Sequence, residues 1–114
     1  MSHGKIISEH EIQCQIIDWL KIKRYFFFRF NTGVMQGSYK GKRSFVRFGV
    51  VGAPDIFVIH HGRIIGLEVK SSKGFQSQAQ ILFGNELVKA GGYYFVVRSL
   101  EEAITALLGR QGND

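Results

Sequence analysis

Three side chains suited to metal and acid–base chemistry are spaced closely along the chain: Asp55, Glu68 and Lys70. Glu68 and Lys70 are two residues apart in "GLEVKS" (66–71), which reads as a strand, so they project from the same face of it. Two carboxylates can share a hard divalent cation such as Mg²⁺, which polarises a phosphoryl oxygen and activates a bound water. A neighbouring lysine can orient that water or neutralise charge on the phosphate. Together the three residues predict a phosphodiester-hydrolysing site.

A β-hairpin is expected to bring these residues together. In "DIFVIHHGRIIGLEVK" (55–70) two β-branched runs flank a turn at Gly62. A turn there pairs residue i with about residue 124 − i, which places Asp55 opposite the region of Val69. Leu67 and Val69 would face away from Glu68 and Lys70, into the core.

Each piece also has an ordinary structural explanation. A glutamate and a lysine on one strand face commonly form a solvated ion pair, and Pro-Asp commonly forms a turn. The conjunction favours chemistry, because Asp55 and the Glu68–Lys70 pair are joined by a short hairpin of apolar strands within a basic protein.

The other elements follow from periodicity and capping residues. "SEHEIQCQIIDWLKI" (8–22) predicts a helix that Ser8 caps in a capping box with Glu11. A second helix is expected over 77–92, with Ser77 and Gln80 at the same spacing, and a third from 99 to about 108, with 109–114 a loose tail. Strands are expected at 25–30, 44–50 and 93–98, and the glycine-rich segment 31–43 reads as a loop or a mobile hairpin. The order αββββαβα predicts one α/β domain with a mixed central sheet flanked by helices.

Charge and composition indicate the class of partner. The formal net charge is +6 over 114 residues, which favours a polyanion such as nucleic acid. The single cysteine, Cys14, fits a reducing compartment, and neither a signal peptide nor an apolar run of membrane-spanning length is apparent. We therefore expect an intracellular, cytoplasmic protein without a membrane segment.

Five segments in this order resemble the virus-type replication-repair nuclease (VRR-NUC) domains of the PD-(D/E)XK nuclease superfamily. They are "SEHEIQCQIIDWL", "RFNTG", "RFGVVGAPDIFV", "GLEVKSSKGFQSQAQ" and "GGYYFVVRS", which span residues 8–99. The resemblance implies a restriction-endonuclease-like fold, an endodeoxyribonuclease activity and Mg²⁺ or Mn²⁺ as the cofactor.

The resemblance also implies roles for individual residues. Asp55, Glu68 and the Val69 carbonyl would hold the metal ion, and Lys70 would be the catalytic lysine. Glu9 would complete the acidic cluster, with Glu11 as its rival. Gln80 matches the family's glutamine on the helix that follows, while Asn31 and Gly33 match its "NxG" element.

Basic residues near these elements are the expected DNA contacts, because lysine and arginine bind phosphates without reading sequence. Together with Asn31, the candidates are Arg29, Lys40, Lys42, Arg43, Arg47 and Lys73. The aromatic run Tyr25–Phe28 could stack on bases, but core or interface packing is the favoured interpretation. His60 and His61, at the far end of the hairpin, lack companions for a zinc site.

Relatives of this short kind are associated with cutting four-way junctions as dimers, so the resemblance implies a homodimer that cuts branched DNA, similar to a Holliday-junction resolvase. A flap, nicking or restriction-like nuclease is an alternative within the enzymes. A non-catalytic DNA-binding module and a basic interaction protein with a surface ion-pair cluster are alternatives outside them.

Overall fold

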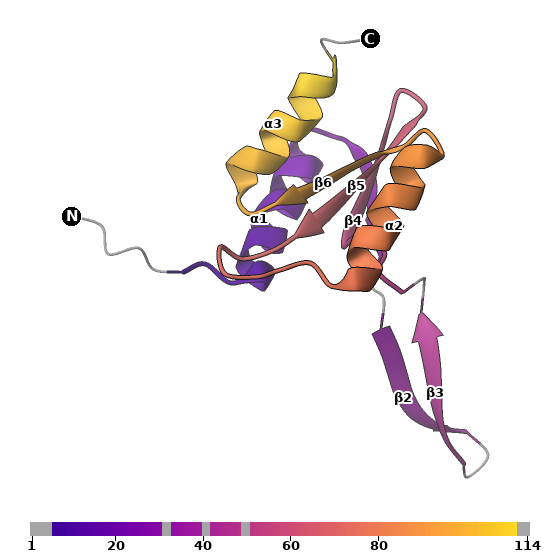
Figure 1. The fold of residues 1–114 in the computed structure, drawn as a ribbon. Helices are drawn as coiled ribbons and strands as arrows, with labels where there is room; N and C mark the ends of the chain where they lie inside the picture. Colours follow the sequence, from indigo (N-terminus) through magenta and orange to yellow (C-terminus); the bar gives the residue numbers. More distant parts are fainter. Residues whose placement is uncertain (1–5, 31–32, 40–41, 49–50, 112–114) are drawn as a thin grey trace.

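A computed structural model describes residues 6–30, 33–39, 42–48 and 51–111, and of 33–39, 42–48, 110 and 111 only the backbone. Figure 1 shows the elements along the chain. They are α1 (Glu9–Ile22), β1 (Phe26–Arg29), β2 (Gly33–Tyr39), β3 (Lys42–Phe48), β4 (Ile56–His60), β5 (Arg63–Val69), α2 (Gln78–Lys89), β6 (Tyr93–Val97) and α3 (Leu100–Gln111).

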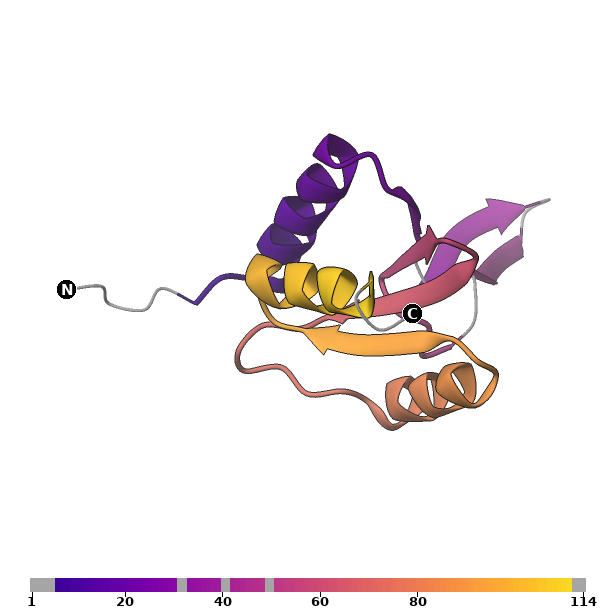
Figure 2. The same cartoon turned by 90° about the horizontal axis from the view of Figure 1, so that it is seen from above.

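The expected mixed α/β sheet is confirmed. Its strand order is β1-β4-β5-β6, with antiparallel pairs except between β5 and β6, which run parallel. The parallel pair follows from the α2 crossover, because a helix returns the chain to the starting end of the sheet. α1 and α3 cover one face of the sheet and α2 covers the other (Figure 2).

The predicted strand count was wrong. Residues 33–39, which glycines mark as a loop or hairpin, form β2 and pair with β3 from Gly33–Phe48 to Tyr39–Lys42. The order is therefore αβββββαβα, and β2 and β3 make a separate two-stranded sheet that projects from the body (Figure 1). Backbone pairing between adjacent segments outweighed the local breaking tendency of the glycines.

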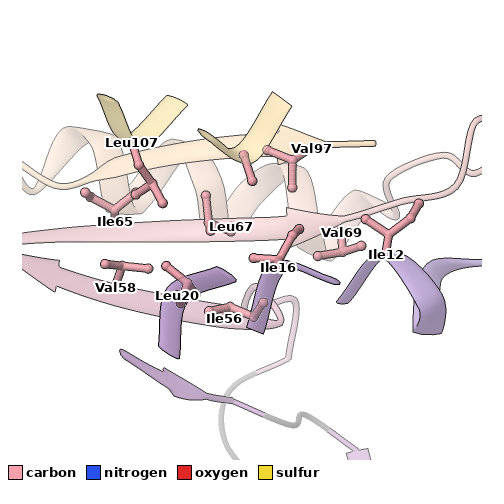
Figure 3. Packing of buried hydrophobic residues seen from close by; sticks show 11 residues of the cluster. Ile12, Ile16, Leu20, Ile56, Val58, Ile65, Leu67, Val69, Val97 and Leu107 are labelled. Atoms are coloured by element: carbon pink, nitrogen blue, oxygen red, sulfur yellow. The ribbon is translucent and has the colours of Figure 1, made fainter. Parts of the chain in front are cut away.

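The core lies between the sheet and the α1–α3 face (Figure 3). α1 contributes residues four apart and the strands contribute residues two apart, as the periods of helix and strand require. The buried cluster consists of Ile12, Ile16, Leu20, Ile56, Val58, Ile65, Leu67, Val69, Val97, Ala103 and Leu107.

The helix starts agree with the sequence, and the ends of α2 and α3 do not. α2 ends at Lys89 rather than continuing to residue 92. Ser8 with Glu11 and Ser77 with Gln80 form complete capping boxes, as predicted. α3 runs to Gln111 rather than ending near Leu108. None of the helices that the structure describes has both the length and the apolarity needed to cross a bilayer.

The β4–β5 register is one residue away from the predicted one. His61 and Gly62 have φ of 52° and 79° and form a two-residue turn that the pair His60–Arg63 closes. Positive φ at both central residues is the type I′ pattern. The turn is centred between His61 and Gly62 rather than on Gly62, so Ile56 pairs with Leu67.

Candidate active site

The topology brings five elements to one end of the four-stranded sheet. β1 and β5 end there, β4 begins there, and β6 ends beside β5 because the two are parallel. The first turn of α2 reaches the same end, since Gln80 contacts Glu68. This end is where we expected the chemistry, and Asp55, Glu68 and Lys70 all lie at it.

Asp55 is fixed at the entrance to β4. Its Oδ2 accepts a 2.8 Å hydrogen bond from the Val69 backbone N–H, and its carbonyl accepts one of 2.8 Å from Phe30. The preceding Gly52 has φ of 86°, and a Cβ there would lie 2.3 Å from the Ala79 carbonyl oxygen, so only glycine fits against the start of α2. Asp55 is therefore tied to β1, to β5 and, through its own segment, to α2.

Glu68 is a buried carboxylate with only 2% of its surface exposed. Its Oε2 accepts a 2.9 Å hydrogen bond from Gln80 Nε2. Its Oε1 is also buried, and no group in the described part of the chain forms a hydrogen bond with it. Because buried polar atoms are nearly always paired, an unpaired carboxylate oxygen indicates a position for a ligand, such as a cation, that is not part of the chain.

The Gln80 amide has two functions at once. Its Oε1 accepts the Ser77 backbone N–H at 2.8 Å, which completes the α2 capping box. A backbone N–H can only donate, so this bond fixes the amide orientation and leaves Nε2 to donate to Glu68. The sequence offered the capping box and the site contact as separate possibilities, and the structure contains both.

Lys70 lies beside Glu68, as their spacing on β5 requires. Its Nζ is 3.8 Å from Glu68 Oε2, and its side chain is 12% exposed. The Lys70 backbone N–H donates to the Val97 carbonyl, which extends the β5–β6 pairing past Val69. The ammonium is thus held at the sheet end with limited access to solvent.

Glu9, and not Glu11, is the α1 carboxylate near this cluster. A Cβ placed on Gly74 would lie 3.0 Å from Glu9 Oε2 and 3.4 Å from Lys70 Cδ, so both side chains border the same short loop. Glu11 is engaged elsewhere, since its Oε1 accepts the Ser8 backbone N–H at 3.1 Å.

Crowded negative charge and burial alter the acidities. Desolvation, followed by repulsion from Asp55, raises the pKa of Glu68 to about 8; Lys70 opposes this rise and Glu9 adds to it. Desolvation also raises the pKa of Asp55, with a smaller rise from Glu9, while the Val69 hydrogen bond, Lys70 and Arg29 oppose it. Ionising both carboxyl groups would therefore place more negative charge here than the described groups compensate.

These residues fit a divalent cation in part. Within the described ranges, no three histidine, cysteine, aspartate or glutamate side chains converge as a ready metal cage. Asp55 lies close enough to Glu68 for their charges to repel, which raises the pKa of Glu68. Two carboxylates suffice for Mg²⁺, which keeps several waters, and the unpaired Oε1 of Glu68 fits such an ion.

The predicted DNA contacts are only partly placed. Arg29 is exposed, donates a 3.3 Å hydrogen bond to Gln13 and lies at the end of β1 beside Asp55. Lys73 is exposed on the loop after β5. Lys42, Arg43 and Arg47 belong to β3, of which the backbone is described, and Asn31 and Lys40 lie outside the described residues.

Sequence reasoning missed Arg98. Its Nη1 donates to the carbonyls of Ser71 and Gly74, at 2.6 and 2.8 Å, and so holds the loop that borders Glu9 and Lys70. The clue was the parallel β5–β6 pair: Val69 aligns with Val97, so the residues that follow, Lys70 and Arg98, leave the sheet side by side.

Comparisons with known proteins do not identify a relative: no family model matches the chain, and no curated protein matches it significantly.

The first prediction concerns the stability of the protein in a chelating buffer. The pKa of Glu68 is about 8 in the folded chain, against 4.5 for the unperturbed group, so the folded state binds the extra proton between these values. The free energy of unfolding should therefore fall as pH rises from 5 to 8, by up to about 1.4 kcal/mol per unit, and level off above. Urea unfolding across this range measures it.

Glu68→Gln imitates the protonated carboxyl and should flatten that pH dependence. The matched control is Glu86→Gln, which changes an exposed glutamate of α2 and should keep the slope. If the free energy of unfolding of the wild-type protein were the same at pH 5 and pH 9, the raised pKa of Glu68 would be contradicted.

The second prediction separates the two functions of Gln80. Gln80→Glu keeps an acceptor for the Ser77 N–H but replaces the donor to Glu68 with a carboxylate, so the free energy of unfolding at pH 8 should drop by about 1–3 kcal/mol. Ser77→Ala removes the cap alone and should cost about 1 kcal/mol at any pH. Equal losses at pH 5 and pH 8 in Gln80→Glu would show that only the cap matters.

Proposed function

We propose that this chain is a metal-dependent endonuclease that hydrolyses DNA phosphodiester bonds. The observation that carries the proposal is the arrangement of Asp55, Glu68 and Lys70 at one sheet end, where a buried oxygen of Glu68 has no hydrogen-bond partner among the described residues. The resemblance of the sequence to VRR-NUC domains supports the same function through the matching residues, and the four-stranded mixed sheet flanked by helices is compatible with the fold that it implies.

Asp55 and Glu68 would hold a Mg²⁺ or Mn²⁺ ion, with the Val69 carbonyl as a further oxygen ligand. When bound, such an ion polarises the phosphoryl oxygen and lowers the pKa of a bound water. The hydrogen bonds from Val69 to Asp55 and from Gln80 to Glu68 orient one oxygen of each carboxylate and leave the other available. Glu9 adds negative charge, which raises the pKa of both carboxyl groups and would likewise attract a metal cation.

Lys70 is the group suited to the phosphate. Its ammonium lies 3.8 Å from Glu68 and remains partly accessible, so it can bind a phosphoryl oxygen or orient a water near the carboxylates. The Arg98 hydrogen bonds to Ser71 and Gly74 limit the motion of the loop beside it. These contacts hold the Lys70 ammonium in position before a substrate binds.

The path of the chain favours DNA as the substrate. β1 ends and β4 begins at the site end, so the connection between them, which contains β2 and β3, leaves from that end (Figure 1). That connection contains the basic residues Lys42, Arg43 and Arg47, in a chain with a net charge of +6. A projecting basic hairpin suits contact with a phosphate backbone beside the site.

The finer specificity rests on the resemblance. We propose a homodimer that cuts branched DNA, as in Holliday-junction resolution, because a two-fold axis would present two sites to the two symmetric strands. A flap, nicking or restriction-like nuclease would use the same site on another substrate. The intact carboxylates and lysine disfavour a binding module without catalysis.

Cleavage of a four-way junction tests the function. In Mg²⁺ the wild-type protein should make paired cuts, and Asp55→Asn or Glu68→Gln should slow cutting on the order of 10³-fold or more, because the metal supplies several kcal/mol of transition-state stabilisation. Gel analysis of end-labelled junction, flap and duplex, with and without EDTA, measures the rates.

Glu11→Gln is the matched control, since it changes an α1 carboxylate outside the site and should cut like the wild type. Binding, followed by fluorescence anisotropy, should survive in Asp55→Asn. Cutting of flaps alone would discard the resolvase and keep the nuclease. Tight binding without cutting in Mg²⁺ or Mn²⁺ would favour the binding module.

The hairpin makes a separate prediction. Lys42→Ala combined with Arg43→Ala should weaken junction binding and reduce the slope of log K against log salt concentration by roughly 1–2, because each phosphate contact contributes about 0.9 for duplex DNA. Lys89→Ala, a basic residue in the last turn of α2, is the control. An unchanged slope would remove the hairpin from the interface.

A further inference from the structure

A second cavity lies at the opposite end of the sheet from Asp55 and Glu68. Its volume is about 570 Å³, within the range of small-molecule sites, roughly 300–1,000 Å³. It lies where α1 ends and the β4–β5 turn begins. We call this cavity the end pocket. Its lining includes five ring-bearing residues, Trp19, Tyr25, Phe26, His60 and His61, and two cationic ones, Lys23 and Arg24.

The rings of the end pocket form a continuous series. Trp19 and Tyr25 stack with centroids 5.5 Å apart, Tyr25 lies 5.1 Å from His60, and His60 lies 4.0 Å from His61. His61, the last ring of the series, is exposed. Series of aromatic faces of this kind are where proteins stack nucleobases, which all have a π-face.

The charge of the end pocket selects an anion. Lys23 and Arg24 line it, and none of the described residues that line it is acidic. The cavity between β6 and α3 differs, since Glu101 and Glu102 line that one. Rings next to cations without a carboxylate suit a molecule that has both an aromatic system and a phosphate.

Arg24 occupies a position that favours glycine. Its φ is 62°, and the N–H groups of Arg24 and Tyr25 donate to the carbonyls of Lys21 and Leu20, which is the Schellman end of α1. A side chain in this left-handed conformation destabilises the fold relative to glycine. The chain retains an arginine there despite that cost.

His61 repeats the pattern on the other side of the end pocket. It has φ of 52° at the first position of the type I′ turn, where asparagine, aspartate and glycine are preferred. Arg24 and His61 are the two non-glycine residues with positive φ in the described part of the chain, and both line this cavity. Strained residues gathered around one cavity point to a function that requires their side chains.

We propose that the end pocket binds one nucleotide unit of unpaired nucleic acid. The base lies against the ring series that ends at His61, and the phosphate is bound by Lys23 and Arg24. The five residues of β4 separate the pocket from Asp55 by roughly 16 Å, at about 3.3 Å per residue. Binding there requires neither the metal nor cleavage, so it goes beyond the proposed nuclease activity and can fail or succeed independently of it.

Trp19 is the only tryptophan of the chain and therefore reports on the end pocket. We expect a ten-residue oligo-dT, in EDTA at about 50 mM salt, to quench its fluorescence in a saturable manner. dTMP should quench the fluorescence of Trp19 more weakly than oligo-dT does. It should nevertheless act at a lower concentration than inorganic phosphate. Equal responses to dTMP and phosphate would exclude recognition of the base and overturn the proposal.

Two substitutions remove the ligand groups while relieving the backbone. Arg24→Gly should weaken oligo-dT binding about tenfold, and His61→Asn about fivefold or more. Both should keep or raise the melting temperature, because glycine and asparagine suit those conformations. Loss of binding can therefore not be attributed to unfolding.

Lys21→Ala is the matched control. Lys21 is an exposed cation in the last turn of α1, two residues from Lys23 and outside the lining, so its loss should change oligo-dT affinity less than twofold. Equal losses in Lys21→Ala and Arg24→Gly would indicate diffuse charge and refute a pocket. Another outcome is that Arg24→Gly and His61→Asn bind oligo-dT normally but sediment as smaller species than the wild type. The end pocket would then be a contact surface for a second copy of the chain, and the proposal would be wrong.

Discussion

The burial of one carboxylate, Glu68, is the constraint on which the rest of the structure depends. A buried charge is costly unless it is paired and hydrogen-bonded. Glu68 accepts a hydrogen bond from Gln80 and lies 3.8 Å from the Lys70 ammonium. Its other oxygen has no partner among the residues that the structure describes, and its pKa rises to about 8. Compensation within the chain is thus incomplete. A residue selected for stability alone would be apolar or amide at this position, so the deficit indicates a ligand that supplies positive charge.

The fold holds Glu68 in place through contacts on both faces of β5. Leu67 and Val69 are fully buried in the core between the sheet, α1 and α3, so the strand cannot rotate to expose Glu68. On the other face α2 begins at a capping box whose glutamine reaches Glu68. The parallel return to β6 then brings Arg98 next to the loop after Lys70. Core packing and local capping together determine the position of the site.

The features that depend on residues close together in the sequence could be predicted from it. The capping boxes at Ser8 and Ser77, the alternation along β5 and the convergence of Asp55 with Glu68 could all be read from spacing. The turn register could not, because the choice between turns centred on Gly62 or before it depends on whether His61 accepts a positive φ. β2 depended on pairing with β3, and the contact of Arg98 depended on the order of strands, neither of which a short window contains.

Each end of the sheet contains residues that are not the most stabilising ones for their positions, and the reason differs between the two ends. At one end the departure is electrostatic, since Glu68 is buried without full pairing. At the other it is conformational, since Arg24 and His61 have backbone geometries that other residues adopt more readily. Neither departure is needed for the core, which lies between the two ends and consists of apolar side chains in regular elements. A single substitution could relieve each one, so packing does not account for their presence. The proposed ligands would account for both departures. A cation would pair with Glu68, and contacts with a nucleotide would require the side chains of Arg24 and His61 where other residues suit the backbone better.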